Sequence, residues 1–459
     1  MSIDTSQEEM EMRGGQGSRV SNTAALTAYK PIEGKGAVQP PVVDASTFAF
    51  SGVEEGQLAF GCAYGLGRVM KELDPDGTRK AEPIYARLST SSMSTVESMM
   101  KAIEPGADWA FLGPAGMSCA TMLVVTACHQ KLDTGNPGLG MIRRDIVLYS
   151  HPVYGGTHAL MEKVAPRFGF RAVAVDMRNL EAVRDAIKEF GGRIGLVYCE
   201  TPANPTMAMV DIRAIADLLQ DMYGDESRPV FAIDNTFAGI FQHPLLLGAD
   251  VCLYSGTKYL GGHSDLIAGF LVGRTGKMCA IKSFDQGVVS VPFEMAILAH
   301  RTVMGFTPSS EMAHKLFTHM QTYILRMRKQ AENATAIAEW LATHEKVARV
   351  YFPTLLEGTD AELYRKQMSG PSAMIAFELK DKSEKAVTVF LDSLKVVLLA
   401  VSLGFVRSLA EHPRTMTHSD ITVEEQEKMG ITGGLIRLSI GLEEPEDIMA
   451  DLDQALAKV

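Results

Sequence analysis

Lys258 is the residue whose setting in this sequence most clearly predicts chemistry. It lies in the segment SGTKYLGGHSD, residues 255–265, directly after an apolar run typical of a buried strand. Most lysines are solvated surface residues, but a lysine at the end of a buried strand loses hydration and needs a partner. A carbonyl cofactor offers one, because imine formation converts the amine into a covalent anchor. The hydroxyls of Ser255 and Thr257 could then donate hydrogen bonds to a phosphate on that cofactor.

Asp234 directly follows the apolar run Val230–Ile233. The next apolar run along the chain, Val251–Tyr254, is the one that leads to Lys258. A carboxylate in this place could simply cap the next turn, so alone it does not decide the matter. Its position at the end of the preceding strand of the same predicted sheet places it beside Lys258. A pyridine ring that accepts electrons needs an anion opposite its nitrogen, so that the ring stays protonated. Together the two residues predict pyridoxal 5'-phosphate (PLP) as the cofactor.

Two further segments could complete such a site. GPAGMS, residues 113–118, opens a helical pattern, and the backbone N–H groups of Gly116 and Met117 at a helix start would favour a phosphate. The Walker lysine and the G-x-G-x-x-G pattern are both absent here, which argues against a nucleotide. Tyr154, in HPVYGGTH, follows another strand-like run. Its ring could stack on a cofactor and its hydroxyl could move protons, or it could be a packed core residue.

The elements that must position these residues follow an alternating pattern. Five short apolar runs alternate with helical periodicity, and one helix is expected to begin after Asp211 as its N-cap. Strands that are apolar throughout imply a mostly parallel sheet covered by helices on both faces, an α/β fold. Ligands of such sheets bind beyond the carboxyl ends of the strands. The runs are Ile146–Tyr149, Ala172–Val175, Leu196–Tyr198, Val230–Ile233 and Val251–Tyr254.

The chain is expected to divide into three regions. Residues 1–85 lack sustained periodicity and predict a disordered tail followed by an extended N-terminal arm, with a Gly-rich loop at 61–67. Residues 86–304 predict the large cofactor-binding domain, and residues 305–459 a smaller C-terminal α+β domain. The elements expected in this last domain are a long helical pattern through Ala342, strands at 373–379 and 435–440, and a helix from Glu446.

Composition narrows the classes of partner. The 459 residues are 46% hydrophobic and carry a net charge of -11 without a basic block, which excludes nucleic acid and an anionic membrane surface as expected partners. No segment resembles a signal or transit peptide, and none approaches the ~18 consecutive apolar residues of a membrane span. The six cysteines are scattered without a C-x-x-C pair, so free thiols in a reduced cytoplasmic protein are expected, with no metal site.

Taken together, these segments resemble the Cys/Met-metabolism PLP enzymes. That family includes cystathionine γ-synthase, cystathionine β- and γ-lyases, methionine γ-lyase and the homoserine-ester sulfhydrylases. The resemblance runs from about Gln39 to the C-terminus, and its final stretch is most similar to methionine γ-lyase and cystathionine γ-lyase. The segments that carry it are IYARLS, AGM, VYGGT, ETPANPT, DNTF, SGTKYLGGHSD, SLG, EHPRTMTHS and GITGGLIRLSIGLE.

The resemblance implies the type I fold of PLP-dependent transferases, similar to aspartate aminotransferase, and a homotetramer built from dimers that share their active sites. It implies that Lys258 binds the cofactor and shuttles protons, that Asp234 pairs with the pyridinium, and that Tyr154 stacks on the ring as an acid/base. The remaining implied roles are phosphate binding by Gly116, Met117, Ser255 and Thr257, phosphate binding from the neighbouring subunit by Tyr85 and Arg87, and binding of the substrate α-carboxylate by Ser402 and Arg437.

Three departures bear on the substrate. The segment before Tyr85 is longer than in typical members, and Gly156 stands where methionine γ-lyases generally carry a cysteine. The family usually has a glutamate after the Ser-Leu-Gly, in a pattern like SLGGVESL, whereas this chain reads SLGFVRSL with Arg407. In relatives the glutamate lies near the distal end of the substrate. Arg407 could therefore bind an anionic γ-substituent, or it could only face solvent or pair with an internal acid.

The resemblance implies a PLP-dependent lyase that performs γ-elimination on a small-molecule substrate, a methionine- or cystathionine-like amino acid. One alternative is γ-replacement on an activated homoserine ester, which would use the same cofactor residues. Another is γ-elimination of an unusual substrate, such as a halogenated amino acid, in a natural-product pathway. The complete cofactor-binding set argues against a non-catalytic scaffold.

Overall fold

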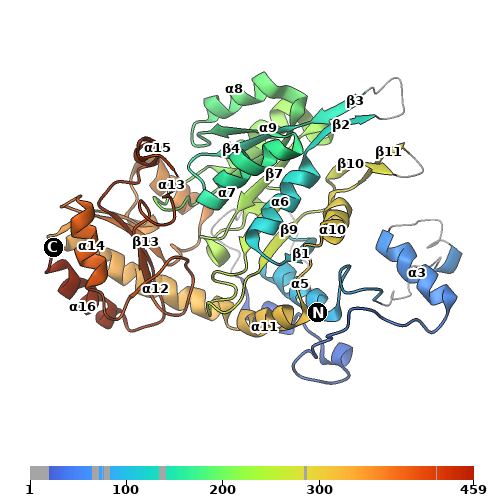
Figure 1. Ribbon diagram of the computed structural model, residues 1–459, viewed down its shortest axis with the longest axis horizontal. Helices are drawn as coiled ribbons and strands as arrows, with labels where there is room; N and C mark the ends of the chain where they lie inside the picture. The colour runs from blue at the N-terminus through green and yellow to red at the C-terminus, as the bar shows by residue number, and fades with distance from the viewer. Residues whose placement is uncertain are drawn as a thin grey trace.

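The computed structural model describes residues 20–64, 72–74, 76, 83–133, 141–283, 287–419 and 421–459. A central sheet with helices packed around it forms the larger part, and a second sheet with its own helices forms the C-terminal part (Figure 1). Most of the predicted disordered tail, residues 1–19, lies outside the described residues.

The central sheet has seven strands in the order β1-β9-β8-β7-β6-β4-β5. Its five strands from β4 to β8 are mutually parallel, and β9 runs antiparallel to both β1 and β8. The prediction of a mostly parallel sheet and its five apolar strands is therefore confirmed. The strands are β1 Trp109–Gly113, β4 Ile146–Ser150, β5 Arg171–Val175, β6 Ile194–Glu200, β7 Val230–Asp234, β8 Val251–Ser255 and β9 Gly269–Gly273.

Helices cover both faces of this sheet because alternate residues of each strand point to opposite sides. Val147 and Tyr149 of β4 pack in one apolar cluster with α6 and α10, whereas Ile146 and Leu148 pack in another with α8 and α9. Asp211 accepts a hydrogen bond from the backbone of Ala214 at 3.0 Å, so it is the N-cap that the sequence predicts. The helices are α5 Ser91–Ile103, α6 Gly116–Ala127, α7 Gly155–Ala159, α8 Leu180–Phe190, α9 Ile212–Ser227 and α10 Phe293–Met304.

The C-terminal part is built on a five-stranded sheet in the order β12-β13-β16-β15-β14. The two predicted strands are its central pair, β13 and β16, which run antiparallel. Its elements are α12 Tyr323–Thr343, β12 Val347–Tyr351, α13 Gly358–Gln367, β13 Met374–Leu379, α14 Glu384–Asp392, β14 Leu398–Leu399, β15 Leu409–Glu411, α15 Val423–Lys428, β16 Leu435–Ser439 and α16 Pro445–Leu456.

The long helical pattern predicted after about residue 305 through Ala342 corresponds to two helices rather than one. The chain forms two helices, α11 Ser310–Met320 and α12, separated at Gln321 and Thr322. Apolar residues stay in helical register across the break, because Met320 and Tyr323 are both buried in the same cluster. The apolar period therefore does not reveal the corner between α11 and α12.

The N-terminal arm contains two helices, α2 Asn22–Thr27 and α3 Val53–Tyr64. Gly61 lies inside α3, so the start of the predicted Gly-rich loop is helical instead, and the rest of that loop lies largely outside the described residues. Thr47 forms a β-bridge with Tyr85, which brings the two ends of the segment carrying α3 together. The described residues also form two hairpins: β2 His129–Asp133 with β3 Met141–Arg144, and β10 Met278–Ser283 with β11 Gly287–Pro292.

One apolar cluster joins α5, α11 and α12 to the C-terminal sheet, so the two large regions share a continuous core. The boundaries at residues 85 and 304 stay a prediction. Across the described ranges, no helix combines the length and apolarity that crossing a membrane requires.

Candidate active site

The carboxyl ends of five strands meet at a cavity of about 320 Å³. Strand β1 runs in the same direction as β4, β6, β7 and β8, because β9 is antiparallel to both of its neighbours. Each of the five strands therefore delivers a polar or glycine-rich connection to the same edge of the sheet, as expected for such folds. Residues from these strand ends that line the cavity are Gly116, Met117, Tyr154, Glu200, Asp234, Ser255, Thr257 and Lys258, and the C-terminal part adds Ser402 and Arg437.

The Lys258 amine lies inside this cavity and donates a hydrogen bond from Nζ to the Ser402 hydroxyl at 2.6 Å. Burial, followed by the nearby Arg437 cation, lowers the pKa of Lys258 to about 8. Both effects disfavour an additional positive charge. A lysine with this pKa carries a substantial neutral fraction near pH 7, which is the form that attacks a carbonyl or accepts a proton.

Asp234 is a partly buried carboxylate at the end of β7. One oxygen accepts from the Tyr198 hydroxyl at 3.0 Å, and the other accepts from the hydroxyl and backbone N–H of Thr236 at 2.6 and 3.1 Å. Burial raises the pKa of Asp234, and these hydrogen bonds partly offset the effect. Across the described residues no ion pair joins Asp234 to a cation, so its negative charge is available to a cationic group in the cavity.

A second carboxyl group, Glu200, lies beside Asp234 on the adjacent strand β6. Its oxygens accept from the backbone N–H groups of Tyr154 at 2.8 Å and Asn204 at 2.9 Å. Burial, followed by the Asp234 charge, raises the pKa of Glu200 to about 8. Two buried carboxylates this close do not both ionise readily, so at neutral pH the site favours one negative charge. We assign that charge to Asp234, whose oxygens have hydroxyl donors.

Arg437, on β16 of the C-terminal part, also lines the cavity. Its guanidinium forms an ion pair with Glu411 at 2.8 Å, donates to the Asn204 side chain at 3.1 Å and donates to the Ser402 carbonyl at 2.8 Å. The Thr417 hydroxyl in turn donates to Glu411 at 2.9 Å. These contacts fix the plane of a buried fork-shaped cation, the geometry that suits bidentate binding of a carboxylate.

The rim of the cavity is more exposed and less polar than its floor. Tyr154, Ile267 and Val401 line the cavity and are 43%, 64% and 54% exposed. Burial, followed by the Glu200 carboxyl, raises the pKa of Tyr154. The phenol therefore keeps its proton at neutral pH in this chain and can serve as a proton donor.

Three predicted site residues do not line this cavity. Arg87 donates to the Thr302 carbonyl at 2.9 Å and lies over the Tyr85 ring at 5.5 Å. Arg407 is exposed and donates to the Val396 carbonyl at 3.4 Å. Its position does not support a contact with the distal end of a substrate in the same chain, because the side chain is exposed and does not line the cavity.

Comparisons with known proteins agree with this geometry. Residues 22–457 match the family described as Cys/Met metabolism PLP-dependent enzyme. L-methionine γ-lyase of Fusobacterium nucleatum subsp. polymorphum is 36% identical over 92% of this chain and 94% of that protein. Cystathionine β-lyase of Bacillus subtilis is 33% identical over 94% of each. A crystal structure of cystathionine γ-synthase from Xanthomonas oryzae pv. oryzae superposes with a TM-score of 0.78 at 30% identity, over 96% of this chain and 99% of that one.

The chain belongs to this family. It is a PLP-dependent enzyme of the γ-eliminating or γ-replacing type, and its fold is the type I fold that the sequence predicts.

The residues of the cavity fit PLP. Asp234 offers a partly buried anion for the ring nitrogen, and Lys258 offers an amine with a lowered pKa. The first turn of α6 offers backbone donors at Gly116, where a Cβ atom would approach the Ser255 Cβ to 3.2 Å, so a glycine keeps the space beside Ser255 open. Phosphate oxygens suit such a helix start flanked by hydroxyl groups.

The sequence analysis gave no role to several residues that shape the site. Glu200 ends β6 just as Asp234 ends β7, but the predicted strand stopped at Tyr198, two residues before Glu200. A strand predicted to its full length would have selected Glu200 by the rule that selected Asp234. Asn204 and Glu411 fall within ETPANPT and EHPRTMTHS, segments that carried the resemblance without individual roles. Tyr198 lies within a predicted strand, and only the packing shows that its hydroxyl reaches Asp234.

Proposed function

We propose that this enzyme catalyses γ-elimination on an amino acid with a thioether at its γ-carbon, a methionine- or cystathionine-like substrate. The observation that carries the proposal is the arrangement of the cavity: the Arg437 fork and the Ser402 hydroxyl lie on one side, the Lys258 amine is 2.6 Å from that hydroxyl, and the Tyr154 phenol lies at the rim. The similarity to methionine γ-lyases and cystathionine lyases supports it.

In this proposal Arg437 binds the substrate α-carboxylate through its two-pronged guanidinium, with Ser402 beside it. When bound, PLP supplies an electron sink for the charge that develops at the substrate α-carbon. Lys258 would accept the α-proton, return it within the site and, as a neutral amine again, accept the β-proton, which its lowered pKa permits near neutral pH. Tyr154, which keeps its own proton, donates it to the departing γ-sulfur. Asp234 keeps a negative charge on the far side of the cofactor site.

The rim favours an apolar leaving group over a charged one. Ile267 and Val401 offer hydrocarbon surface to the distal end of a substrate, whereas the cations that line the cavity in the described residues are Lys258 and Arg437, both already engaged at the proximal end. A methyl thioether suits that surface, and a distal amino-acid group would be desolvated without a matching partner. Methionine-like substrates are therefore our first choice.

The test is a product analysis of the purified holoenzyme. L-methionine, cystathionine, O-acetylhomoserine with an added thiol, and a γ-halogenated amino acid are supplied separately, and products are identified by mass. The proposal expects a 2-oxo acid, ammonia and a thiol from the thioethers. A new thioether from the homoserine ester, with no 2-oxo acid from methionine, would instead establish γ-replacement. Turnover of the halogenated amino acid alone would establish γ-elimination of an unusual γ-substituted substrate.

We propose further that a second copy of the chain completes each site, within the predicted homotetramer in the cytoplasm. Arg87 and Tyr85 do not reach the cavity of their own chain, and no arginine among the described lining residues stands beside Gly116 and Ser255. Subunits of Arg87→Ala and Lys258→Ala, each inactive, should regain part of the activity after mixing, because some hybrid sites carry both intact residues. Mixed oligomers that stay inactive would contradict sharing.

A further inference from the structure

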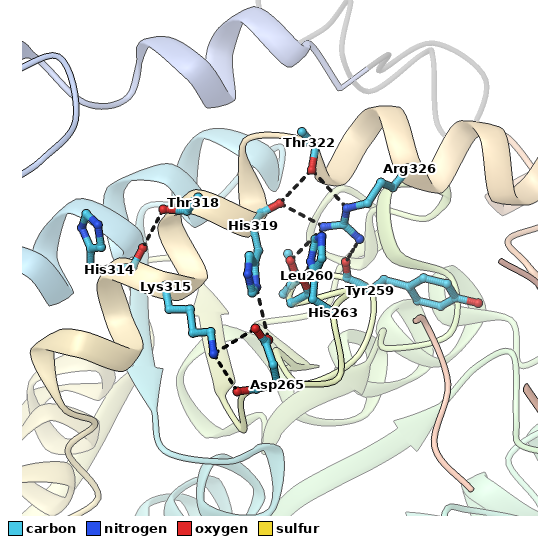
Figure 2. A network of polar contacts seen from close by, with 11 residues as sticks. Tyr259, Leu260, His263, Asp265, His314, Lys315, Thr318, His319, Thr322 and Arg326 are labelled. Carbon is cyan, nitrogen blue, oxygen red and sulfur yellow. Dashed lines mark hydrogen bonds and ion pairs between the residues drawn. The ribbon is translucent and has the colours of Figure 1, made fainter. Parts of the chain in front are cut away.

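Arg326 is a buried cation of α12 that makes its contacts with backbone carbonyl groups rather than with an acid. Its side chain donates to the carbonyl oxygens of Tyr259, Leu260 and His319 at 2.8, 3.1 and 3.0 Å (Figure 2). Its Nε donates to the Thr322 hydroxyl at 3.2 Å. Only 5% of the residue is exposed, and no carboxylate among the described residues forms an ion pair with it. Burial lowers the pKa of Arg326 to about 10, so the placement is costly.

Two of these carbonyls belong to the turn that carries the catalytic lysine. The backbone N–H of Gly262 donates to the Lys258 carbonyl at 2.7 Å, which closes one turn from Lys258 to Gly262. The chain then leaves the turn at Gly262, whose φ is +69°, so the carbonyls of Tyr259 and Leu260 have no following helical turn to accept from. Carbonyls at the end of a helical turn attract a cation. Arg326 supplies the donors that the chain itself does not.

The same turn is tightly confined on two sides. A Cβ atom at Gly262 would lie 1.9 Å from Arg326 Nη1, so the backbone and the guanidinium are in direct contact. A Cβ atom at Gly404 would lie 2.5 Å from the Tyr259 nitrogen, which shows that the segment after Ser402 presses on the other side. The turn from Lys258 to Gly262 is therefore held between two parts of the chain: the irregular segment that contains Ser402 and Gly404, and the corner between α11 and α12.

Other contacts between this loop and α11 are more exposed. Lys315 forms an ion pair with Asp265 at 2.9 Å, but the lysine side chain is 47% exposed, and such surface pairs contribute little. The rings of His263 and His319 lie 4.1 Å apart (Figure 2). Among these contacts Arg326 is the buried connection, and it bonds the residues that directly follow Lys258.

We propose that Arg326 is a positioning residue for Lys258. By joining the carbonyls of Tyr259 and Leu260 to the α11–α12 corner, the guanidinium fixes the direction in which the lysine side chain leaves its turn. The Lys258 amine is thereby kept in the cavity against Ser402, where burial holds its pKa low. This inference rests on the proposed role of Lys258 in proton transfer and adds the residue that maintains its geometry.

The experiment compares four variants of the holoenzyme and of the protein freed of PLP. Arg326→Met removes the fork, and Arg326→Lys keeps a charge but cannot bridge the same carbonyls. Thr322→Val removes the contact with Arg326 Nε and the hydrogen bond that the Thr322 hydroxyl donates to the His319 carbonyl at 3.2 Å. Because Thr322 is exposed, this variant should disturb the fold least. Arg328→Met is the matched control on the same helix, where the guanidinium donates to the Val20 carbonyl at 3.0 Å far from the turn.

Four quantities are measured for each: kcat, KM, the exchange rate of the substrate α-proton with deuterium from solvent, and the pH midpoint at which the cofactor-free protein captures PLP. For Arg326→Met we expect kcat and α-proton exchange to fall by about ten- to a hundredfold while KM changes by less than about twofold. The pH midpoint should rise, because a loosened turn lets the amine reach water. Arg326→Lys should be intermediate, Thr322→Val should shift in the same direction by less, and Arg328→Met should match the parent.

A lower melting temperature of Arg326→Met with an unchanged pH midpoint and unchanged kcat would show a purely structural role and overturn the inference. If Arg326→Met does not fold, the same two readouts in Arg326→Lys and Thr322→Val decide. The PLP-capture midpoint needs no substrate, so it still tests the positioning of Lys258 if the proposed γ-elimination proves wrong.

Discussion

The floor and the rim of the cavity are built in opposite ways. On the floor, Glu200 and Arg437 are buried, Asp234 is partly buried, and each is held by two or more hydrogen bonds or an ion pair. At the rim, Ile267 and Val401 are apolar and more than half exposed. Arg407 lies outside the cavity, and its charged side chain is exposed. A fixed floor is what cofactor chemistry requires, because its groups must stay aligned through every proton transfer.

The difference suggests that the floor determines turnover and the rim determines selectivity between substrates. Substitutions on the floor should reduce turnover of every substrate, because each substrate shares the same α-carbon, carboxylate and cofactor. Substitutions at the rim should change the ratio between substrates, because only the γ-substituent reaches that far. Four predictions test this division, beginning with the largest effect.

Lys258→Ala should lower turnover of all substrates by at least about a thousandfold, because it removes the group that accepts and returns protons. Borohydride treatment of the parent enzyme should fix the cofactor on the peptide that contains Lys258, and this product should disappear in the variant. Peptide mass spectrometry provides the measurement. A product on a different lysine, or a parent protein that stays colourless with added PLP, would contradict the assignment.

Arg437→Lys should raise KM for every amino-acid substrate by roughly ten- to a hundredfold, since an ammonium cannot bind a carboxylate through two parallel hydrogen bonds. The substitution keeps a positive charge beside Glu411, so the buried acid is not left unpaired. Steady-state kinetics with at least two substrates provide the check. A fall in kcat at constant KM would show that Arg437 acts on the chemical step instead.

The pH at which the protein freed of PLP captures the cofactor should reflect the lowered pKa of Lys258. Because this pKa is about 8 rather than its usual value near 10.5, the neutral amine becomes the major form as the pH rises through 8. The capture rate should therefore increase about tenfold between pH 7 and pH 9 and then level off. Stopped-flow absorbance follows the reaction. A rate that continues to climb beyond pH 10 would show an amine exposed to water.

The placement of several cavity residues at the ends of strands could be predicted from the sequence. The apolar runs before Asp234 and Lys258 placed both residues at the same edge of a parallel sheet, because strand ends are fixed by a local pattern. Tyr154 and Gly116 followed from the same rule. These are short-range features, in which the residues near a strand end determine where its side chains point.

The contacts made across the fold could not be predicted in this way. Nothing near Arg326 in the sequence indicates that it bonds the Lys258 turn, because the α11–α12 corner is hidden by an apolar period that continues through it. Arg407 shows the reverse case. Its position beside the Ser-Leu-Gly segment was compatible with a contact to substrate and with a side chain that faces solvent, and the structure shows an exposed side chain outside the cavity.

The smallest effect is therefore expected at Arg407, and comparison with Val401 makes it decisive. Val401 lines the cavity, whereas Arg407 is exposed and bonds a backbone carbonyl at the outer limit of hydrogen-bond distance. Arg407→Glu should change kcat/KM for methionine and cystathionine by less than about twofold, and their ratio by even less, because a solvated charge interacts weakly with a group inside the cavity. Val401→Glu places the same carboxylate on the apolar rim. It should lower kcat/KM for methionine by about tenfold or more, while cystathionine, whose distal end carries an ammonium, loses less. Competition between the two substrates, read by product mass, measures both ratios directly. A larger shift in selectivity from Arg407→Glu than from Val401→Glu would contradict this prediction. It would show that residue 407 lies close to the substrate, in the cavity of a neighbouring subunit, and belongs to the rim rather than to the outer surface.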